Sequence, residues 1–114
     1  IDIYHFGYPG FIIKKPREGD FEQAKIAWAK AKEMISDDYE IIILDELNIA
    51  LFYELLNIKE IVEFLKNYKE KKEIVITGRY AKKELLDISD LVTEMNLVKH
   101  YFEKGIIARE GIEF

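Results

Sequence analysis

The sequence predicts an α/β domain, in which a mainly parallel sheet carries helices on its faces. The first observation is the order of the expected elements, which alternate as β, α, β, α, α, β, α, β along the chain. The second is the segment at residues 40–44, where four apolar residues, three of them β-branched, follow one another. Continuous apolar runs are typical of parallel strands buried on both faces, and right-handed crossovers then join such strands.

Composition limits the classes of protein that need to be considered. The chain has 114 residues, 49% of them apolar, which is enough for the core of a single domain covering residues 1–114. The formal net charge is −5 and no basic tract occurs, so nucleic acid is not expected as a partner. The absence of cysteine excludes disulfides, thiolate metal sites and cysteine nucleophiles. No apolar run reaches the roughly 20 residues of a membrane helix and no signal peptide opens the chain, so we expect a cytoplasmic protein without membrane contact.

The first third of the chain contains a strand and a helix. Residues 1–6 are rich in β-forming side chains and end at a glycine, and a turn follows over residues 8–10. Asp20 is expected to cap a helix of about four turns, with Gln23 completing a capping box. Apolar side chains recur along that helix at spacings of three and four, and Trp28 lies in this stripe, so we expect it in the core.

The remainder alternates in the same way. Residues 48–56 form an almost wholly apolar helical segment, which we expect to be buried or covered by a partner. Asn57 is expected to cap the next helix, which extends to about residue 68. The further elements expected are a strand at 73–77, a short helix at 81–88, a strand at 91–95 and a short strand at the C-terminus.

The first candidate site is the acidic pair Asp45 and Glu46, which ends the apolar strand abruptly. In open α/β sheets ligands bind at the carboxyl ends of strands. A buried strand that stops on a carboxylate fits the Walker-B pattern, in which an acid is presented to Mg²⁺ beside substrate phosphates. Neighbouring strand residues point to opposite faces, so only one of the two acids is expected to face the metal. The alternative is that both merely favour the N-terminus of the following helix.

The second candidate site is Thr77-Gly78-Arg79, at the end of the next strand. Glycine lets a backbone approach a ligand, and the planar guanidinium of arginine suits phosphate. The alternative is an ordinary turn with an exposed arginine. His5 and His100 lack the spacing of a zinc site, and no glycine-rich phosphate loop occurs in the sequence.

Together these motifs resemble a known family, the ATP:corrinoid adenosyltransferases of the CobA/CobO/BtuR type. The resemblance extends from about Asp20 onward and includes the helix around Trp28. The motifs that carry it are, in order, Ile42-Ile43-Leu44-Asp45-Glu46-Leu47-Asn48, Ile76-Thr77-Gly78-Arg79, Asp90-Leu91-Val92-Thr93-Glu94-Met95, Val98-Lys99-His100, Phe102-Glu103-Lys104-Gly105 and Gly111-Ile112-Glu113-Phe114. Several motifs in the right order make the resemblance specific.

The resemblance implies a RecA-like P-loop fold, a homodimer and a flavoprotein reductant. It implies transfer of the 5′-deoxyadenosyl group of ATP to the Co(I) of a reduced corrinoid, which leaves triphosphate. Glu46 matches the family's Mg²⁺-binding acid, with Asp45 beside it. Arg79 lies in the matching Thr77-Gly78 element, which implies a role on the phosphate side.

Two departures from the family pattern modify these expectations. The N-terminal Walker-A segment of the family has no counterpart in this sequence, so we expect a truncated piece of a longer protein, inactive as given, whose P-loop unit is absent. The family's corrinoid-contacting Gly-Phe-Thr-Trp appears as Gly10-Phe11-Ile12-Ile13, which keeps Phe11 as the candidate corrinoid contact.

Two other functions stay open at this level. The first is a non-catalytic interaction module that lost nucleotide binding and uses the helix at Ile49–Leu56 as a dimer surface. The second is a receiver-like regulatory domain with Asp45 as phosphoacceptor. The latter is the weaker of the two, because Phe6-Gly7 supplies no acidic pair after the first strand.

Overall fold

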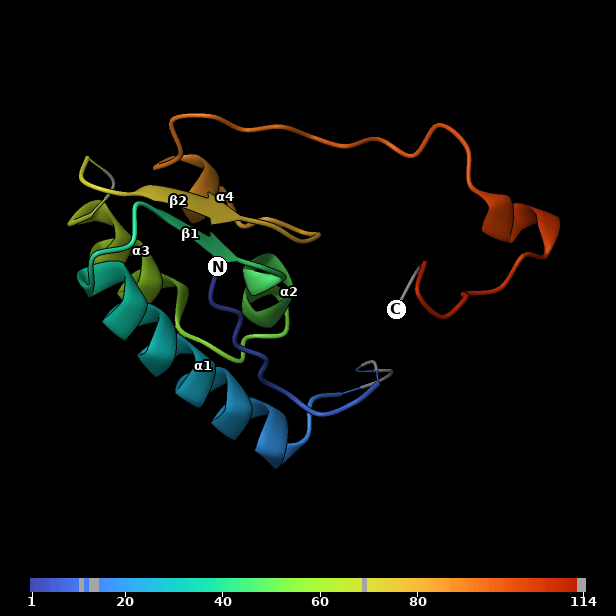
Figure 1. The fold of residues 1–114 in the computed structure, drawn as a ribbon, viewed down its shortest axis with the longest axis horizontal. Helices are drawn as coiled ribbons and strands as arrows, with labels where there is room; N and C mark the ends of the chain where they lie inside the picture. The colour runs from blue at the N-terminus through green and yellow to red at the C-terminus, as the bar shows by residue number, and fades with distance from the viewer. Residues whose placement is uncertain (11, 13–14, 69, 113–114) are drawn as a thin grey trace.

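A computed structural model describes residues 1–10, 12, 15–68 and 70–112 of the chain. It is a small α/β structure with an extended C-terminal segment (Figure 1). The elements, in chain order, are α1 (Glu18–Ser36), β1 (Ile41–Leu44), α2 (Leu47–Phe52), α3 (Ile58–Lys66), β2 (Glu73–Ile76), α4 (Lys83–Leu86) and a 3-10 turn, η1 (Tyr101–Lys104).

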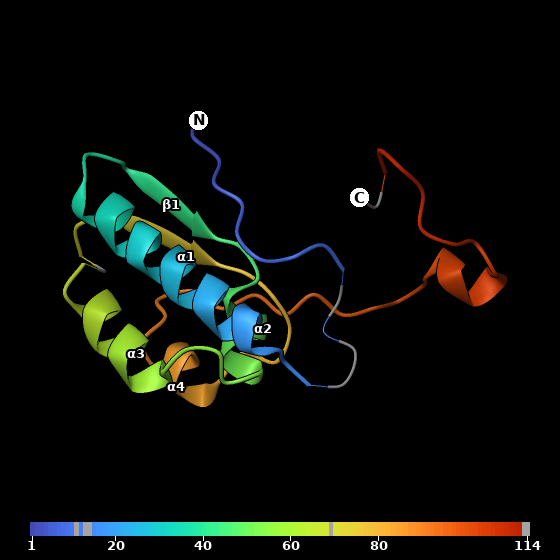
Figure 2. The ribbon, with the colours of Figure 1, turned by 90° about the horizontal axis from the view of Figure 1, so that it is seen from below.

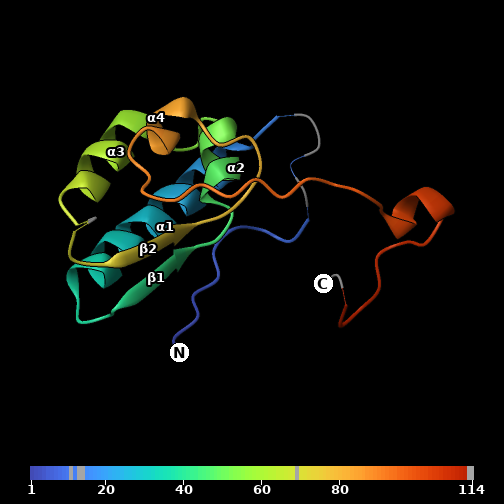
Figure 3. The ribbon, with the colours of Figure 1, turned by 90° about the horizontal axis from the view of Figure 1, so that it is seen from above.

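The two strands pair in parallel, as the sequence predicted. Ile41 pairs with Glu73 and Leu44 pairs with Ile76, so the carboxyl ends of β1 and β2 lie level with one another. The connection between them consists of α2 and α3. Figures 2 and 3 show the helices gathered on one side of this sheet.

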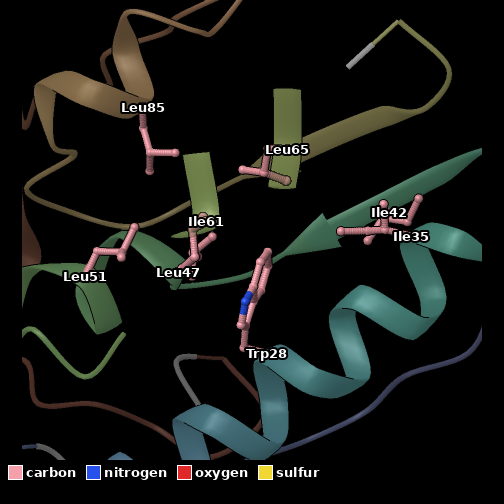
Figure 4. Packing of buried hydrophobic residues seen from close by; sticks show 8 residues of the cluster. All are labelled: Trp28, Ile35, Ile42, Leu47, Leu51, Ile61, Leu65 and Leu85. Atoms are coloured by element: carbon pink, nitrogen blue, oxygen red, sulfur yellow. The ribbon is translucent and has the colours of Figure 1, made fainter. Parts of the chain in front are cut away.

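The core forms between that side of the sheet and the helices. The cluster in Figure 4 draws one or more side chains from α1, β1, α2, α3 and α4. Its buried members are Trp28, Ile35, Ile42, Leu47, Leu51, Ile61, Leu65 and Leu85. Trp28 packs edge-on against Phe64 with ring centroids 5.4 Å apart, and its indole N–H donates to Glu60 Oε1 at 3.3 Å. The prediction that Trp28 is a core residue is confirmed.

The prediction that β1 is buried on both faces is wrong for this structure. Ile42 is 9% exposed, whereas its neighbour Ile43 is 64% exposed and Ile41 is also open to solvent. Successive strand side chains point to opposite sides of the sheet, and the helices cover only the side on which Ile42 lies. An apolar run therefore indicated a strand correctly, but it did not show which faces are covered within this chain.

The two helix starts differ in how well the sequence predicted them. Asn57 caps α3 as expected, since its side chain accepts from the backbone N–H of Lys59 at 2.9 Å. The cap of α1 is Arg17, not Asp20. Asp20 lies three residues inside the helix, where its carboxylate accepts from the Arg17 backbone N–H at 2.7 Å and from the Arg17 guanidinium. Gln23 completes no capping box; it accepts from the Gly7 backbone N–H at 3.5 Å.

Three expected strands are not found in the described residues. Residues 1–6 lie beside α1, where the Asp2 carboxylate accepts from the Tyr39 hydroxyl and Lys30 lies over the Tyr4 ring. Residues 91–95 are extended and exposed, and Figure 1 shows this segment leading away from the sheet. At the C-terminal end a turn precedes residues 113–114, which lie outside the described residues. A strand-like sequence forms a strand only when another strand offers it backbone partners.

The open face of β1 generates the first prediction. Ile42→Ala removes a buried side chain and should lower the free energy of unfolding by about 2–5 kcal/mol. Ile43→Ala, on the same strand but on the open face, should lower it by less than about 1 kcal/mol. Urea denaturation followed by circular dichroism measures both values. Equal losses for the two variants would mean that the face carrying Ile43 is covered in solution.

The Arg17–Asp20 pair generates a prediction about pH. Hydrogen bonds from the Arg17 guanidinium and backbone lower the pKa of Asp20 below its usual range. A lowered pKa in the folded state gives stability that is present above the unfolded pKa of about 3.9 and is lost as pH falls through the folded value. Asp20→Asn lacks the carboxylate that gives this stability. Its melting temperature should therefore fall less than that of the parent chain when the pH is lowered from 7 to below the unfolded pKa. Glu22→Gln, an exposed carboxylate on the same helix, is the control and should behave like the parent.

Candidate active site

The parallel register brings both candidate motifs to one edge of the sheet. Asp45 and Glu46 follow β1, and Thr77 and Gly78 follow β2. The Thr77 hydroxyl donates to Asp45 Oδ1 at 2.6 Å and accepts from the Glu46 backbone N–H at 3.0 Å. We call these four residues the carboxylate corner. The sequence motifs, 32 residues apart at Asp45 and Thr77, are thus joined by direct hydrogen bonds.

Glu46 adopts a backbone conformation that is unusual for its residue type. Its φ is 58° and its ψ is 19°, in the left-handed region, which costs a non-glycine residue about 1–2 kcal/mol. This turn ends the strand geometry, so the rule that adjacent side chains point to opposite faces no longer applies. As a result both acids lie beside the turn at Thr77 and Gly78. Glu46 precedes α2 but makes no side-chain cap of that helix.

Gly78 allows the close contact with Glu46. Its φ is 113°, and a Cβ placed on it would lie 3.1 Å from Glu46 Oε2 and 3.3 Å from Glu46 Cα. Any larger residue would be strained in its backbone and would push against this carboxylate. The glycine therefore does allow a close approach, and in this structure the approaching groups come from Glu46 and Asn48.

Asn48 is a site residue that the functional reading of the sequence missed. It is 7% exposed, its backbone N–H donates to the Thr77 carbonyl at 3.2 Å, and its side-chain amide donates to the Gly78 carbonyl at 3.3 Å. Its Oδ1 is buried and has no hydrogen-bond partner among the described residues. An amide at the start of an otherwise apolar helical segment was the available signal. Asn48 fastens α2 to the turn after β2 and so fixes the two halves of the corner.

The donor set of the carboxylate corner suits a hard divalent cation. It offers two carboxylates and a hydroxyl. Mg²⁺ prefers oxygen ligands and is usually held by only one or two carboxylates, with waters and substrate phosphates completing its shell. Within the ranges that the structure describes, no group of three or more His, Cys, Asp or Glu side chains could hold a metal by itself. The corner therefore fits a shared site better than an all-protein cage.

The two other expected site residues, Arg79 and Phe11, do not belong to the carboxylate corner. Arg79 follows the corner directly and is exposed. Phe11 lies outside the described residues. A hollow of about 330 Å³ opens beyond the end of α2. It is lined by residues 54–58 and Lys82, not by residues of the carboxylate corner. No helix in the part of the chain that the structure describes is long and apolar enough to cross a membrane.

Known proteins are similar to this chain over most of its length. A family model described as ATP:corrinoid adenosyltransferase BtuR/CobO/CobP matches residues 1–114. A corrinoid adenosyltransferase from Sinorhizobium sp is 48% identical over 100 residues, covering 86% of this chain and 47% of that protein. One from Pseudomonas aeruginosa is 37% identical over 113 residues, covering 97% of this chain and 56% of that protein. One from Escherichia coli K12 is 33% identical over 99 residues, covering 86% and 50%.

The chain thus spans about half the length of the curated relatives it matches. These matches do not favour the non-catalytic module or the receiver-like domain, since the relatives named above are all corrinoid adenosyltransferases. By the match over its whole length and by these relatives, the chain belongs to the ATP:corrinoid adenosyltransferase family BtuR/CobO/CobP.

Proposed function

We propose that the protein containing this chain transfers the 5′-deoxyadenosyl group of ATP to the cobalt of a reduced corrinoid. The observation that carries the proposal is the carboxylate corner. It joins an acidic pair and a Thr-Gly turn at the carboxyl edge of two parallel strands, where open α/β sheets bind their ligands. Membership of the family supplies the substrate class, ATP and a corrinoid.

The reaction is a nucleophilic displacement at carbon. The electron pair of Co(I) attacks the ribose C5′ of ATP, the Co–C5′ bond forms, and the C5′–O5′ bond breaks. Triphosphate leaves with the electrons of the broken bond, and the cobalt ends formally as Co(III). The protein must align the two substrates, stabilise the charge that develops on the leaving triphosphate, and keep water away from Co(I).

Glu46 and Asp45 are proposed to hold Mg²⁺ at this edge, with the Thr77 hydroxyl fixing the orientation of the Asp45 carboxylate. When bound, the cation would neutralise charge on the triphosphate. The strained turn at Glu46 and the tight contact with Gly78 keep both acids at the edge before any substrate arrives. Preorganised groups need no rearrangement at the moment of reaction.

The exposed guanidinium of Arg79 is proposed to bind phosphate oxygens, for which its planar fork is suited. Thr77 and Gly78 would shape the phosphate side of the site from the same turn. Phe11 is proposed as a contact for the corrinoid. These three assignments extend the family pattern to the matching positions of this chain.

The larger assembly is also part of the proposal. The chain would be the C-terminal part of a single RecA-like P-loop domain, with helices on both sheet faces in the complete protein. It would act as a homodimer supplied with Co(I) by a flavoprotein reductant, and it would be inactive without the P-loop unit. The exposed face of β1, with Ile41 and Ile43, supports a sheet face that is covered by segments outside this chain.

The role of Glu46 is tested with the protein expressed from its complete natural reading frame. Glu46→Gln keeps the size of the side chain and removes its charge, so Mg²⁺-dependent adenosylation should fall by about 100-fold or more. Titration calorimetry should show a parallel loss of Mg²⁺–triphosphate binding. The control is Glu40→Gln, an exposed glutamate at the opposite end of β1. If Glu46→Gln turned over at the parent rate, Glu46 would have no part in the reaction.

Thr77 provides an independent test of the corner. Thr77→Val keeps the shape but removes the hydroxyl that bonds to Asp45 and to the Glu46 backbone, so turnover should fall about 10- to 100-fold. Thr77→Ser restores the hydroxyl and should restore most of the rate. The measurement is kcat at saturating ATP and corrinoid. Equal rates for the valine and serine variants would contradict a role for the hydroxyl.

A further inference from the structure

Two exposed aromatic rings lie in contact at the same edge of the sheet. Phe52, at the end of α2, and Tyr80, after β2, have ring centroids 4.4 Å apart and an interplanar angle of 32°. Phe52 is 46% exposed and Tyr80 is 61% exposed. We call these residues the aromatic pair. Tyr53 supports it from the side, since its ring lies edge-on to Phe52 at 5.2 Å.

Tyr80 holds this position at a conformational cost. Its φ is 61°, and a bulky side chain rarely adopts a positive φ. Three non-glycine residues of the described ranges have a positive φ, namely Glu46, Glu54 and Tyr80. Each lies in a loop at the carboxyl end of β1 or β2 or at the end of α2. Strain of this kind collects at binding and catalytic sites, where the surrounding structure maintains it.

The aromatic pair is connected to the carboxylate corner by short, ordered segments. Tyr80 follows Gly78 by two residues, and Gly78 contacts Glu46. Phe52 lies five residues beyond Leu47, the first residue of α2, which corresponds to about 7.5 Å of helix at 1.5 Å per residue. A ligand whose phosphates lie at the corner can therefore extend its other end toward the two rings.

A hollow opens among the segments that follow the two rings in the sequence, although neither ring lines it. The hollow of about 330 Å³ is lined by residues that follow each ring closely in the sequence, Glu54 after Phe52 and Lys82 after Tyr80. A carboxylate and an ammonium group there can form hydrogen bonds with the amino group and ring nitrogens of a base. The segments that follow the two rings thus carry polar groups of the kind that ligand pockets combine with apolar surface.

We propose that the aromatic pair is the stacking platform for the adenine base of ATP. The inference rests on the proposed function, because that function puts the triphosphate at the carboxylate corner. Adenine is flat on both faces and similar in size to the exposed rings, and base–aromatic stacking is a general mode of nucleotide binding. A corrin ring carries substituents on both faces, which would hold it away from a stacking surface of this size.

The test compares two variants at Tyr80 in the protein expressed from its complete natural reading frame. Tyr80→Gly removes the ring at a φ that glycine adopts freely, so the fold should survive. The dissociation constant for ATP should rise about 5- to 150-fold, and that for adenosine should rise with it. Tyr80→Phe keeps the ring and should stay close to the parent. Inorganic triphosphate, which lacks the base, should bind equally to all three proteins by titration calorimetry.

Phe102→Ala is the matched control, since Phe102 is an exposed aromatic residue in η1, away from the sheet. An unchanged dissociation constant for ATP in Tyr80→Gly would overturn the proposal, and so would an equal loss of triphosphate binding or a rise confined to the KM for the corrinoid. If ATP and adenosine binding weaken as expected but no adenosylation occurs, the platform stands and the proposed function fails. If adenosylation occurs and Tyr80→Gly binds ATP like the parent, only the platform fails.

Discussion

The in-register pairing of two short parallel strands determines where the chemically useful groups lie. Because Leu44 is level with Ile76, the residues that follow each strand emerge side by side, and Thr77 reaches both Asp45 and the Glu46 backbone. Asn48 then fastens the first turn of α2 to the second loop through two hydrogen bonds. A slip of one residue in the register would separate all of these groups.

Sequence patterns predicted the helices, because the residues of a helix carry its cap and its apolar stripe themselves. Asn57 caps α3 with its own side chain, and the stripe that includes Trp28 makes α1 recognisable from its spacing alone. The segment at residues 91–95 shows the opposite case, since its β-forming side chains need a neighbouring strand that the described residues do not provide. The prediction that Ile43 is buried was wrong for the same reason. Whether a sheet face is covered depends on other segments, which the residues of the strand itself do not reveal.

At the site, the sequence indicated the residue types but not their joint geometry. Asp45, Glu46, Thr77 and Gly78 could be singled out because each follows a strand-like run. The left-handed backbone conformation of Glu46 places both acids beside the loop after β2. The residues around Glu46 contain no pattern that predicts this conformation for a glutamate. Asn48 was missed because a single amide near an apolar helix is common, and its importance depends on where the second loop passes.

The uncovered side of β1 and the extended segment after α4 have a consequence for handling the molecule. Ile41 and Ile43 are exposed apolar residues on β1. Leu91, Met95 and Val98 are exposed apolar residues in the extended segment after α4. Such surfaces attract copies of themselves, and here only a modest negative charge of −5 opposes this. Concentrated samples will therefore be prone to aggregation, especially in high salt, where the repulsion between negatively charged molecules is screened.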